Sequence, residues 1–163
     1  SFFQNRPSGV DALVDEVTGI VNDLGIDGPL IDAYGGIGIF AGTVGRNRRV
    51  TAIERGSDSV ADARVNLAEA DVKIVKAAVE SWKATRSAIV IADPAREGLR
   101  KPGVSALVAS QPDLFVLVSC DPASFARDAG LLAGSGFGLE RVTVVDMFPG
   151  TSHVETIGAF IQV

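Results

Sequence analysis

Two spacings of apolar residues alternate along this chain. Between positions 8 and 24 they recur at every third or fourth position, the spacing of one helix face, with Ser8 suited to begin that helix and Gly25 to end it. Further helices are expected at 39–44, 57–70, 104–110 and 122–134, with a weak turn or helix at 80–84. Apolar runs typical of buried strands occupy 29–34, 50–54, 72–77, 88–92, 114–118, 140–147 and 154–163.

The alternation of these strands with helices predicts an α/β fold. Such a chain forms a doubly wound, mostly parallel sheet, here of seven strands, with helices on both faces. The strands are apolar almost throughout, which agrees with burial on both sides. No long helix separates the last two strands, so the last strand is expected to run antiparallel. The whole of 1–163 is expected to form one domain.

The composition excludes several classes of protein. With 47% hydrophobic and 21% charged residues, and no apolar stretch long enough to span a bilayer, the chain is expected to be neither disordered nor membrane-spanning. Its single cysteine excludes an internal disulfide framework and a four-cysteine metal site, and no metal or protein partner is expected. A free thiol without a secretion signal predicts a cytoplasmic location. The net charge of −5 argues against binding nucleic acid through charge alone.

Chemically distinctive side chains follow the predicted strands. In doubly wound sheets the ligand binds outside the carboxyl ends of the strands, near the point where the strand order reverses. The first strand ends with Asp32 and Tyr34 and the second with Glu54, whereas Asp93 follows the fourth strand and Cys120 follows the fifth.

The loop after the first strand predicts a nucleoside site. Gly36 and Gly38 let the backbone approach a ligand closely and expose helix N–H groups, and Glu54 can accept both hydroxyls of a ribose. A plain tight turn and a surface glutamate are the alternatives. The third glycine of the dinucleotide pattern is missing at 39–41, so adenosine without a pyrophosphate is favoured, and S-adenosylmethionine over NAD.

Cys120 is a candidate covalent nucleophile, although a lone cysteine is usually a small buried hydrophobe. A helix expected to begin at Pro122 should lower the pKa of its thiol, whereas Asp121 opposes this by adding negative charge. Asp93 ends a neighbouring strand and can position a substrate base or the methionine part of a cofactor. A helix cap or a turn-forming aspartate is the alternative for Asp93.

Two residues of the last predicted strand are candidates for a general base. His153 and Glu155 are two positions apart and so share one face of that strand. The alternative is that both lie on a solvated hairpin rim.

A series of motifs covers nearly the whole chain in order. They are Ser1-Phe-Phe-Gln-Asn5, Asp32-Ala-Tyr-Gly-Gly-Ile-Gly38, Ala52-Ile-Glu54, Ala61 to Leu67, Asp93-Pro-Ala-Arg96, Ser119-Cys-Asp-Pro122 with Ala126-Arg-Asp128, and Asp146-Met-Phe-Pro149 with His153-Val-Glu-Thr156. Together they resemble the catalytic domain of the RNA uracil-5-methyltransferases, S-adenosylmethionine-dependent enzymes that make 5-methyluridine in transfer RNA and large-subunit ribosomal RNA. The resemblance implies a Rossmann-like class I methyltransferase fold.

The resemblance also implies a reaction and its residues. A methyl group would pass from S-adenosylmethionine to C5 of a uridine in structured RNA (tRNA or 23S rRNA), through a covalent Cys120–C6 adduct, with Glu155 removing the C5 proton. The cofactor contacts it implies come from Gln4, Tyr34, Glu54 and Asp93, beside Gly36 and Gly38 of the loop. Family members carry an N-terminal RNA-binding region that this chain, which opens at Ser1, lacks. We therefore expect a catalytic fragment that binds cofactor but acts poorly on RNA.

The chain departs from the family's usual pattern at several positions near the cofactor. Ala95 stands where a second proline is usual, Gly35 where a cysteine is usual, and Asp121 where an asparagine is usual. A polar residue is common in the family at Ile39, and an acidic or amide residue near Ala78.

Other functions stay open on the sequence alone. The chain could be another S-adenosylmethionine enzyme of this fold, acting on DNA, protein or a small molecule, with Cys120 as a core residue. It could also be a non-catalytic nucleotide-binding or RNA-partner module. A dehydrogenase is disfavoured by the missing third glycine.

Overall fold

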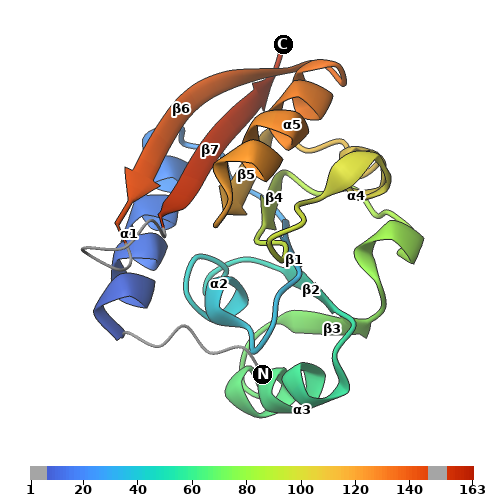
Figure 1. Ribbon diagram of the computed structural model, residues 1–163. Coiled ribbons are helices and arrows are strands. Elements are labelled where there is room, and N and C mark those ends of the chain that lie inside the picture. Colours follow the sequence, from blue (N-terminus) through green and yellow to red (C-terminus); the bar gives the residue numbers. More distant parts are fainter. Residues whose placement is uncertain (1–6, 147–153) are drawn as a thin grey trace.

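A seven-stranded sheet forms the centre of the protein. The computed structural model describes residues 7–146 and 154–163. Its strands are β1 (Leu30–Ala33), β2 (Val50–Glu54), β3 (Val72–Lys76), β4 (Ile89–Ala92), β5 (Leu114–Ser119), β6 (Phe137–Val145) and β7 (Glu155–Gln162). They lie in the order β3-β2-β1-β4-β5-β7-β6 (Figure 1). β1 to β5 pair in parallel, and β7 runs antiparallel to both β5 and β6.

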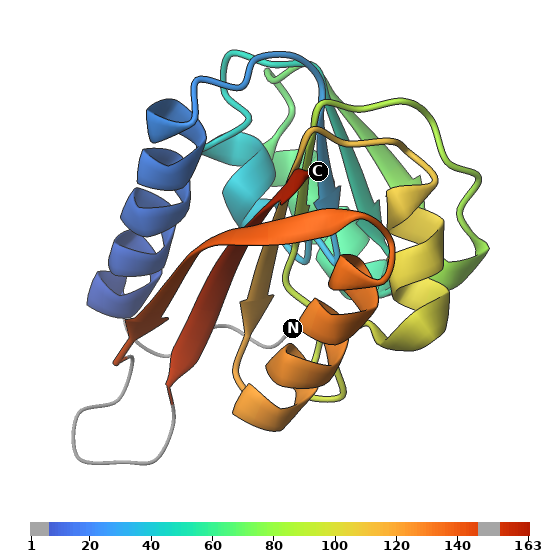
Figure 2. The same cartoon turned by 90° about the horizontal axis from the view of Figure 1, so that it is seen from above.

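Helices cover both faces of this sheet. They are α1 (Pro7–Asp23), α2 (Ile39–Gly42), α3 (Ser57–Asn66), the 3-10 turn η1 (Val79–Ser81), α4 (Arg100–Val108) and α5 (Pro122–Ala133). The first three helices pack their apolar residues on one face, and η1, α4 and α5 pack theirs on the other. Figure 2 shows α1 and α5 on opposite sides of the sheet.

Alternation along the strands divides the core in two. Successive residues of a strand point to opposite faces. In β5, Leu114 and Val116 pack with α1, whereas Phe115 and Leu117 pack with α4 and α5. We call these two sides of the sheet the α1 face and the α5 face.

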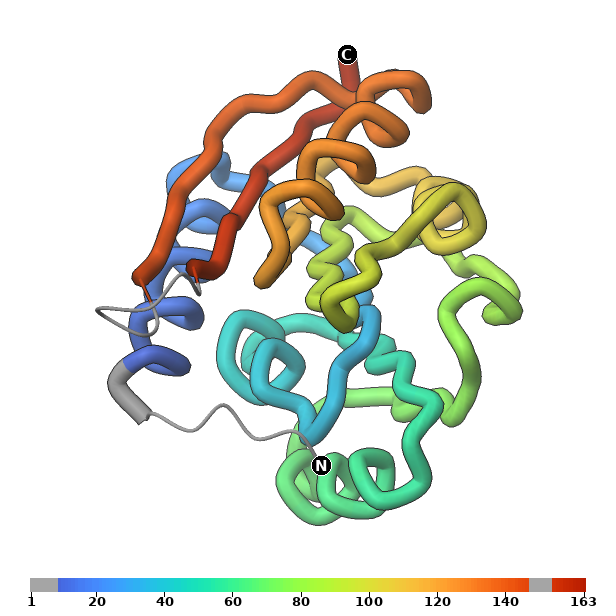
Figure 3. Tube along the Cα trace, viewed as in Figure 1, coloured from blue at the N-terminus to red at the C-terminus, as the bar shows by residue number. Residues whose placement is uncertain are grey.

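The strand order reverses between β1 and β4. The chain places β2 and β3 on one side of β1 and then crosses back to place β4 on its other side (Figure 3). In folds of this kind a crevice opens at such a point, outside the carboxyl ends of the strands.

The predicted architecture is confirmed, including the antiparallel last strand. Two elements, α4 and β6, begin several residues earlier than predicted. α4 begins at Arg100 instead of 104, because Pro102 lies in its first turn, where a missing N–H is tolerated. β6 begins at Phe137 instead of 140, and its mostly exposed residues give only a weak apolar pattern. No helix in the described part of the chain is both long and apolar enough to cross a membrane.

A close approach in the core provides a test of this packing. A Cβ atom on Gly158 of β7 would lie 2.7 Å from ring atoms of both Phe125 and Phe160. We expect Gly158→Ala to lower the free energy of unfolding by about 1–3 kcal/mol through overpacking. Gly130→Ala in α5, where a Cβ would meet no atom within 4 Å, should raise it by up to about 1 kcal/mol. Urea unfolding of both variants measures the difference, and equal stability would contradict the packing.

Candidate active site

The sheet topology brings Cys120 and Glu155 together. β1, β2, β4 and β5 all end at one edge of the sheet, and β7 begins there because it runs the other way. The last pair of the β5–β7 ladder is Ser119 with Thr156. The next residues along the two strands, Cys120 and Glu155, are therefore neighbours across them.

Alternation places four ionisable side chains on the same face. Asp32, Asp93, Cys120 and Glu155 each stand two positions along the chain from a residue of the α1-face core. Those core residues are Leu30, Ile91, Val118 and Ile157. We call Asp32, Asp93 and Glu155 the carboxylate cluster.

Asp32 is the most deeply buried member of the carboxylate cluster, with 1% of its surface exposed. Its Oδ2 accepts a 2.9 Å hydrogen bond from the Ala41 N–H of α2. Its Oδ1 has no hydrogen-bond partner among the described residues. Burial raises the pKa of Asp32 to about 7, and nearby Glu54 adds to the rise.

Glu155 and Asp93 also have raised pKa values. Glu155 is 9% exposed, and its Oε2 is buried without a hydrogen-bond partner in the described part of the chain. Burial raises the pKa of Glu155 to about 7. Burial also raises the pKa of the half-buried Asp93 to about 8, and the charges of Glu155 and Asp32 push it in the same direction. The three carboxyls are therefore close enough to influence one another.

The expected lowering of the Cys120 pKa is wrong for the protein without ligand. Cys120 is exposed, yet partial burial of its thiol raises the pKa, and the charges of Glu155 and Asp93 raise it further. Arg96 works in the opposite direction without reversing the shift. The helix N-terminus does not lower the pKa of Cys120 overall, because burial of the thiol and then the charges of two carboxylates on neighbouring strands raise it.

Asp121 has a structural role that the sequence did not reveal. It is the N-cap of α5, and its Oδ2 accepts a 2.8 Å hydrogen bond from the Ser124 N–H. These hydrogen bonds, together with Arg96 at 3.8 Å, lower the pKa of Asp121. Asp121 therefore interacts with the N-terminus of α5. The negative charges that raise the pKa of Cys120 are those of Glu155 and Asp93.

The glycine loop is held by Glu54. The Glu54 carboxylate accepts hydrogen bonds from the N–H of Gly36 at 3.1 Å and of Gly56 at 2.6 Å. Gly36 and Gly38 have φ angles of 54° and 91°, a region that favours glycine. A Cβ on Gly38 would also collide with Leu67 at 2.6 Å. The structure thus joins the loop to the end of β2, as a nucleoside site requires.

Tyr34 points away from the carboxylate cluster. Its hydroxyl donates a 2.9 Å hydrogen bond to Glu80, and its ring packs against the α5-face core. Burial and that hydrogen bond raise its pKa. Its contact with a cofactor stays a prediction, because the hydroxyl is already bonded on the other side of the sheet. Gln4 and His153 lie outside the described residues.

The loop after β4 is held by side chains of α5, a function that the sequence did not indicate. Ser124 donates a 2.8 Å hydrogen bond to the Arg96 carbonyl, and Arg127 a 2.7 Å bond to the Glu97 carbonyl. Asp128, 1% exposed, accepts the N–H groups of Leu99 and Arg100 at 2.6 and 3.0 Å. An available signal was an aspartate on the buried side of a helix, in helical spacing with Phe125 and Leu132.

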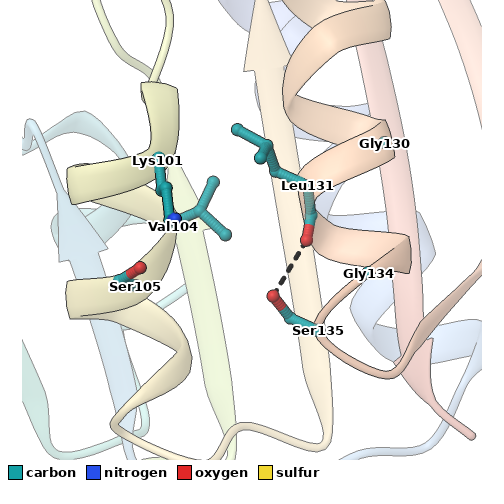
Figure 4. A pocket seen from close by; sticks show the side chains of 7 residues that line it. All are labelled: Lys101, Val104, Ser105, Gly130, Leu131, Gly134 and Ser135. Carbon is teal, nitrogen blue, oxygen red and sulfur yellow. Dashed lines mark hydrogen bonds between the residues drawn. The ribbon is translucent and has the colours of Figure 1, made fainter.

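Two pockets in the described part of the chain lie away from these residues. A pocket of about 220 Å³ lies between α4 and α5, where Val104 and Leu131 point into the gap (Figure 4). Its other lining residues are Lys101, Ser105, Gly130, Gly134 and Ser135. A second, of about 320 Å³, lies at the opposite edge of the sheet, beside Asp27, Arg86 and Asp113. The candidate site therefore rests on strand topology and on the carboxylate cluster.

Comparison with known proteins places the chain among methyltransferases by fold. No family model matches the chain. An uncharacterised RNA methyltransferase of Streptomyces coelicolor is 36% identical over 96% of this chain, and one of Corynebacterium efficiens is 33% identical over the same share. The chain spans 36% and 39% of the length of these two relatives.

Solved structures agree with the fold. The Pyrococcus abyssi tRNA (uracil-54, C5)-methyltransferase, solved with S-adenosyl-L-homocysteine, matches 99% of this chain with a TM-score of 0.86 and 29% identity, over 40% of its own length. The magnesium protoporphyrin IX methyltransferase of Synechocystis, solved with S-adenosylmethionine, has a TM-score of 0.74 at 16% identity, over 96% of this chain and 81% of its own. The chain therefore has the class I methyltransferase fold that was predicted.

The raised carboxyl pKa values predict an unusual dependence of stability on pH. Asp32, Asp93 and Glu155 keep their protons to higher pH in the folded chain than in the unfolded chain. Between about pH 4 and pH 8 the folded state therefore binds more protons, and stability should fall as the pH rises through this window. We expect a loss on the order of a few kcal/mol, measured by urea unfolding at several pH values.

A matched pair of variants separates the carboxylate cluster from ordinary surface charge. Asp93→Asn should raise the free energy of unfolding at about pH 8 and flatten the dependence on pH. Asp113→Asn, at the exposed start of β5 on the opposite edge, should leave the slope unchanged. If Asp93→Asn leaves the dependence of the unfolding free energy on pH unaltered, the pKa of the Asp93 carboxyl is not raised in the folded chain.

Proposed function

We propose that this chain is the catalytic domain of an RNA uracil-C5 methyltransferase. The observation that carries the proposal is the pairing of Cys120 with Glu155 across β5 and β7, beside Asp93, at the edge where ligands of this fold bind. The proposal is supported by two likenesses: the Streptomyces and Corynebacterium relatives are RNA methyltransferases by name, and the Pyrococcus abyssi enzyme modifies uracil at C5.

The cofactor is S-adenosylmethionine, and the residues at this edge suit it. It carries a net positive charge, which complements the buried oxygens of Asp32 and Glu155 that lack partners among the described residues. The adenosine can approach the backbone closely at Gly36 and Gly38, and Glu54 ends the next strand, where it can accept ribose hydroxyls. When bound, the cofactor supplies a methyl group on a positively charged sulfur.

Cys120 activates C5 of uracil by adding to C6. C5 of uracil is too weak a nucleophile to take a methyl group unaided. When the Cys120 thiolate forms a bond to C6, the C5–C6 double bond is lost and its electrons make an enolate with density at C5. This is covalent catalysis by an ionised thiol, so a position at the rim of the site suits an exposed Cys120.

Glu155 completes the cycle as a base. After methylation C5 carries both a proton and the new methyl group. The Glu155 carboxylate takes that proton, the C5–C6 double bond re-forms, and the bond from C6 to sulfur breaks to release the thiolate. A pKa of about 7 suits Glu155 for this step, because a base works best when its pKa lies near the working pH.

Action on RNA requires that the target nucleotide enter the site and that the RNA backbone be held. The target atom lies in a stacked base, so the nucleotide must turn out of the RNA into the site. A chain with a net charge of −5 holds a polyanion poorly by itself. The relatives are more than twice as long as this chain, and we propose that their additional parts hold the RNA backbone.

The cofactor assignment is tested by calorimetry. Titration of this chain with S-adenosylmethionine should give heat, and Glu54→Gln should weaken binding at least about tenfold, because a charged acceptor for the ribose hydroxyls is lost. Glu69→Gln, an exposed glutamate between α3 and β3, serves as the matched control. No heat at millimolar cofactor would instead favour a non-catalytic module.

The reaction is tested by trapping the covalent adduct. We expect the full-length gene product, with S-adenosylmethionine and RNA that contains 5-fluorouridine, to form a stable protein–RNA adduct, because fluorine at C5 blocks the final proton removal. Cys120→Ala should abolish the adduct. Glu155→Gln should form it with ordinary uridine RNA too, because the base is missing. Methyl transfer by Cys120→Ala at the normal rate would eliminate the covalent mechanism and favour another substrate class.

A further inference from the structure

The carboxylates around Cys120 exceed what the proposed reaction needs. One base is enough to remove the C5 proton, and Glu155 fills that role. Asp93 and Asp32 lie on the same face of neighbouring strands. The charge of Asp32 raises the pKa of Asp93, and the charge of Asp93 raises the pKa of Cys120. Of the other charged groups in the described part of the chain, the cation Arg96 acts on Cys120, and Asp121 is bonded to the N-terminus of α5.

Two oxygens of the carboxylate cluster lack a hydrogen-bond partner among the described residues. Asp32 Oδ1 and Glu155 Oε2 are buried, and neither accepts a hydrogen bond within the described residues. The other buried carboxylate among the described residues, Asp128, accepts bonds from Leu99, Arg100 and Arg127. A buried anion without a partner is destabilising, so it is usually paired or binds a cation. A positively charged ligand would supply the missing partner.

We propose that the carboxylate cluster receives the positive charge of the methyl donor, and that this charge favours the thiolate form of Cys120. The nucleophile is then more reactive when the donor is in place. The inference rests on the proposed function for the identity of the donor. It adds a role for Asp93 and Asp32 and an order to the reaction.

Binding of the donor should act on the pKa of Cys120 in the direction opposite to the carboxylate charges. In the free chain, burial and the charges of Glu155 and Asp93 raise the pKa of Cys120 above its usual value near 9. Asp32, Asp93 and Glu155, with pKa values of about 7 to 8, are already ionised where this thiol titrates. A cation within a few ångströms offsets their charge and lowers a neighbouring pKa by about one or more.

The coupling must act in both directions. If the donor makes the thiol ten times easier to ionise, the ionised protein binds the donor ten times more tightly. The demethylated product, S-adenosylhomocysteine, has nearly the same shape but lacks the charge on sulfur. It should therefore leave Cys120 as a thiol, which distinguishes the charge of the ligand from its bulk.

The experiment measures the alkylation of Cys120 by iodoacetamide as a function of pH. The modified peptide is quantified by mass spectrometry in the free chain, with saturating S-adenosylmethionine, and with saturating S-adenosylhomocysteine. The pH midpoint reports ionisation, whereas the plateau rate reports access, so shielding of the thiol by a ligand does not move the midpoint. We expect S-adenosylmethionine to lower the midpoint by about one and S-adenosylhomocysteine to lower it by clearly less.

Variants identify the groups responsible. Glu155→Gln and Asp93→Asn should each lower the midpoint of the free chain and reduce the effect of S-adenosylmethionine, while Asp113→Asn, on the opposite edge, should behave like the unmodified chain. Calorimetric heat with an unchanged midpoint would overturn this inference alone. Absence of binding would overturn the cofactor assignment together with it. Equal shifts with both ligands would overturn the role of the sulfonium charge.

Discussion

The register between β5 and β7 is the constraint on which the whole site depends. A slip of one residue would turn Glu155 to the α5 face and bring Thr156 opposite Cys120. Packing on both sides of β7 prevents such a slip. Ile157 is buried in the α1-face core, while Gly158 faces the α5 side, where it makes room for the ring of Phe125. The pairing of Cys120 with Glu155 therefore follows from ordinary core packing some distance from the two side chains.

A second constraint fixes Asp93 relative to Cys120. α5 begins directly after the Cys120 segment, and its Ser124, Arg127 and Asp128 hold the loop that begins at Asp93. The end of β4 and the end of β5 are thus joined twice, once by the sheet and once by the helix. Groups held in this way need no rearrangement to act together, which is the condition for efficient positioning in an active site.

The architecture was predictable because it depends on patterns that are local in the sequence. Alternating elements gave the doubly wound sheet, and the lack of a long helix before β7 gave its direction. The strand-end residues Asp93 and Cys120 could be placed for the same reason. The pKa of Cys120 could not, because it depends on carboxylates that lie far away in the chain and become neighbours only in the sheet. Asp121 was misjudged as an isolated charge because its partner is a backbone N–H of the helix that it caps.

The acidic residues of this chain show how a ligand site can be told apart from structural charge. Asp121 and Asp128 have oxygens that accept hydrogen bonds from helix N–H groups, so they stabilise the fold without a ligand. Asp32 and Glu155 are buried with oxygens that no group in the described residues satisfies. Such an arrangement does not stabilise the fold, since an apolar residue of similar volume would serve better. The proposed cation-binding role therefore rests on these unsatisfied oxygens, independently of any motif.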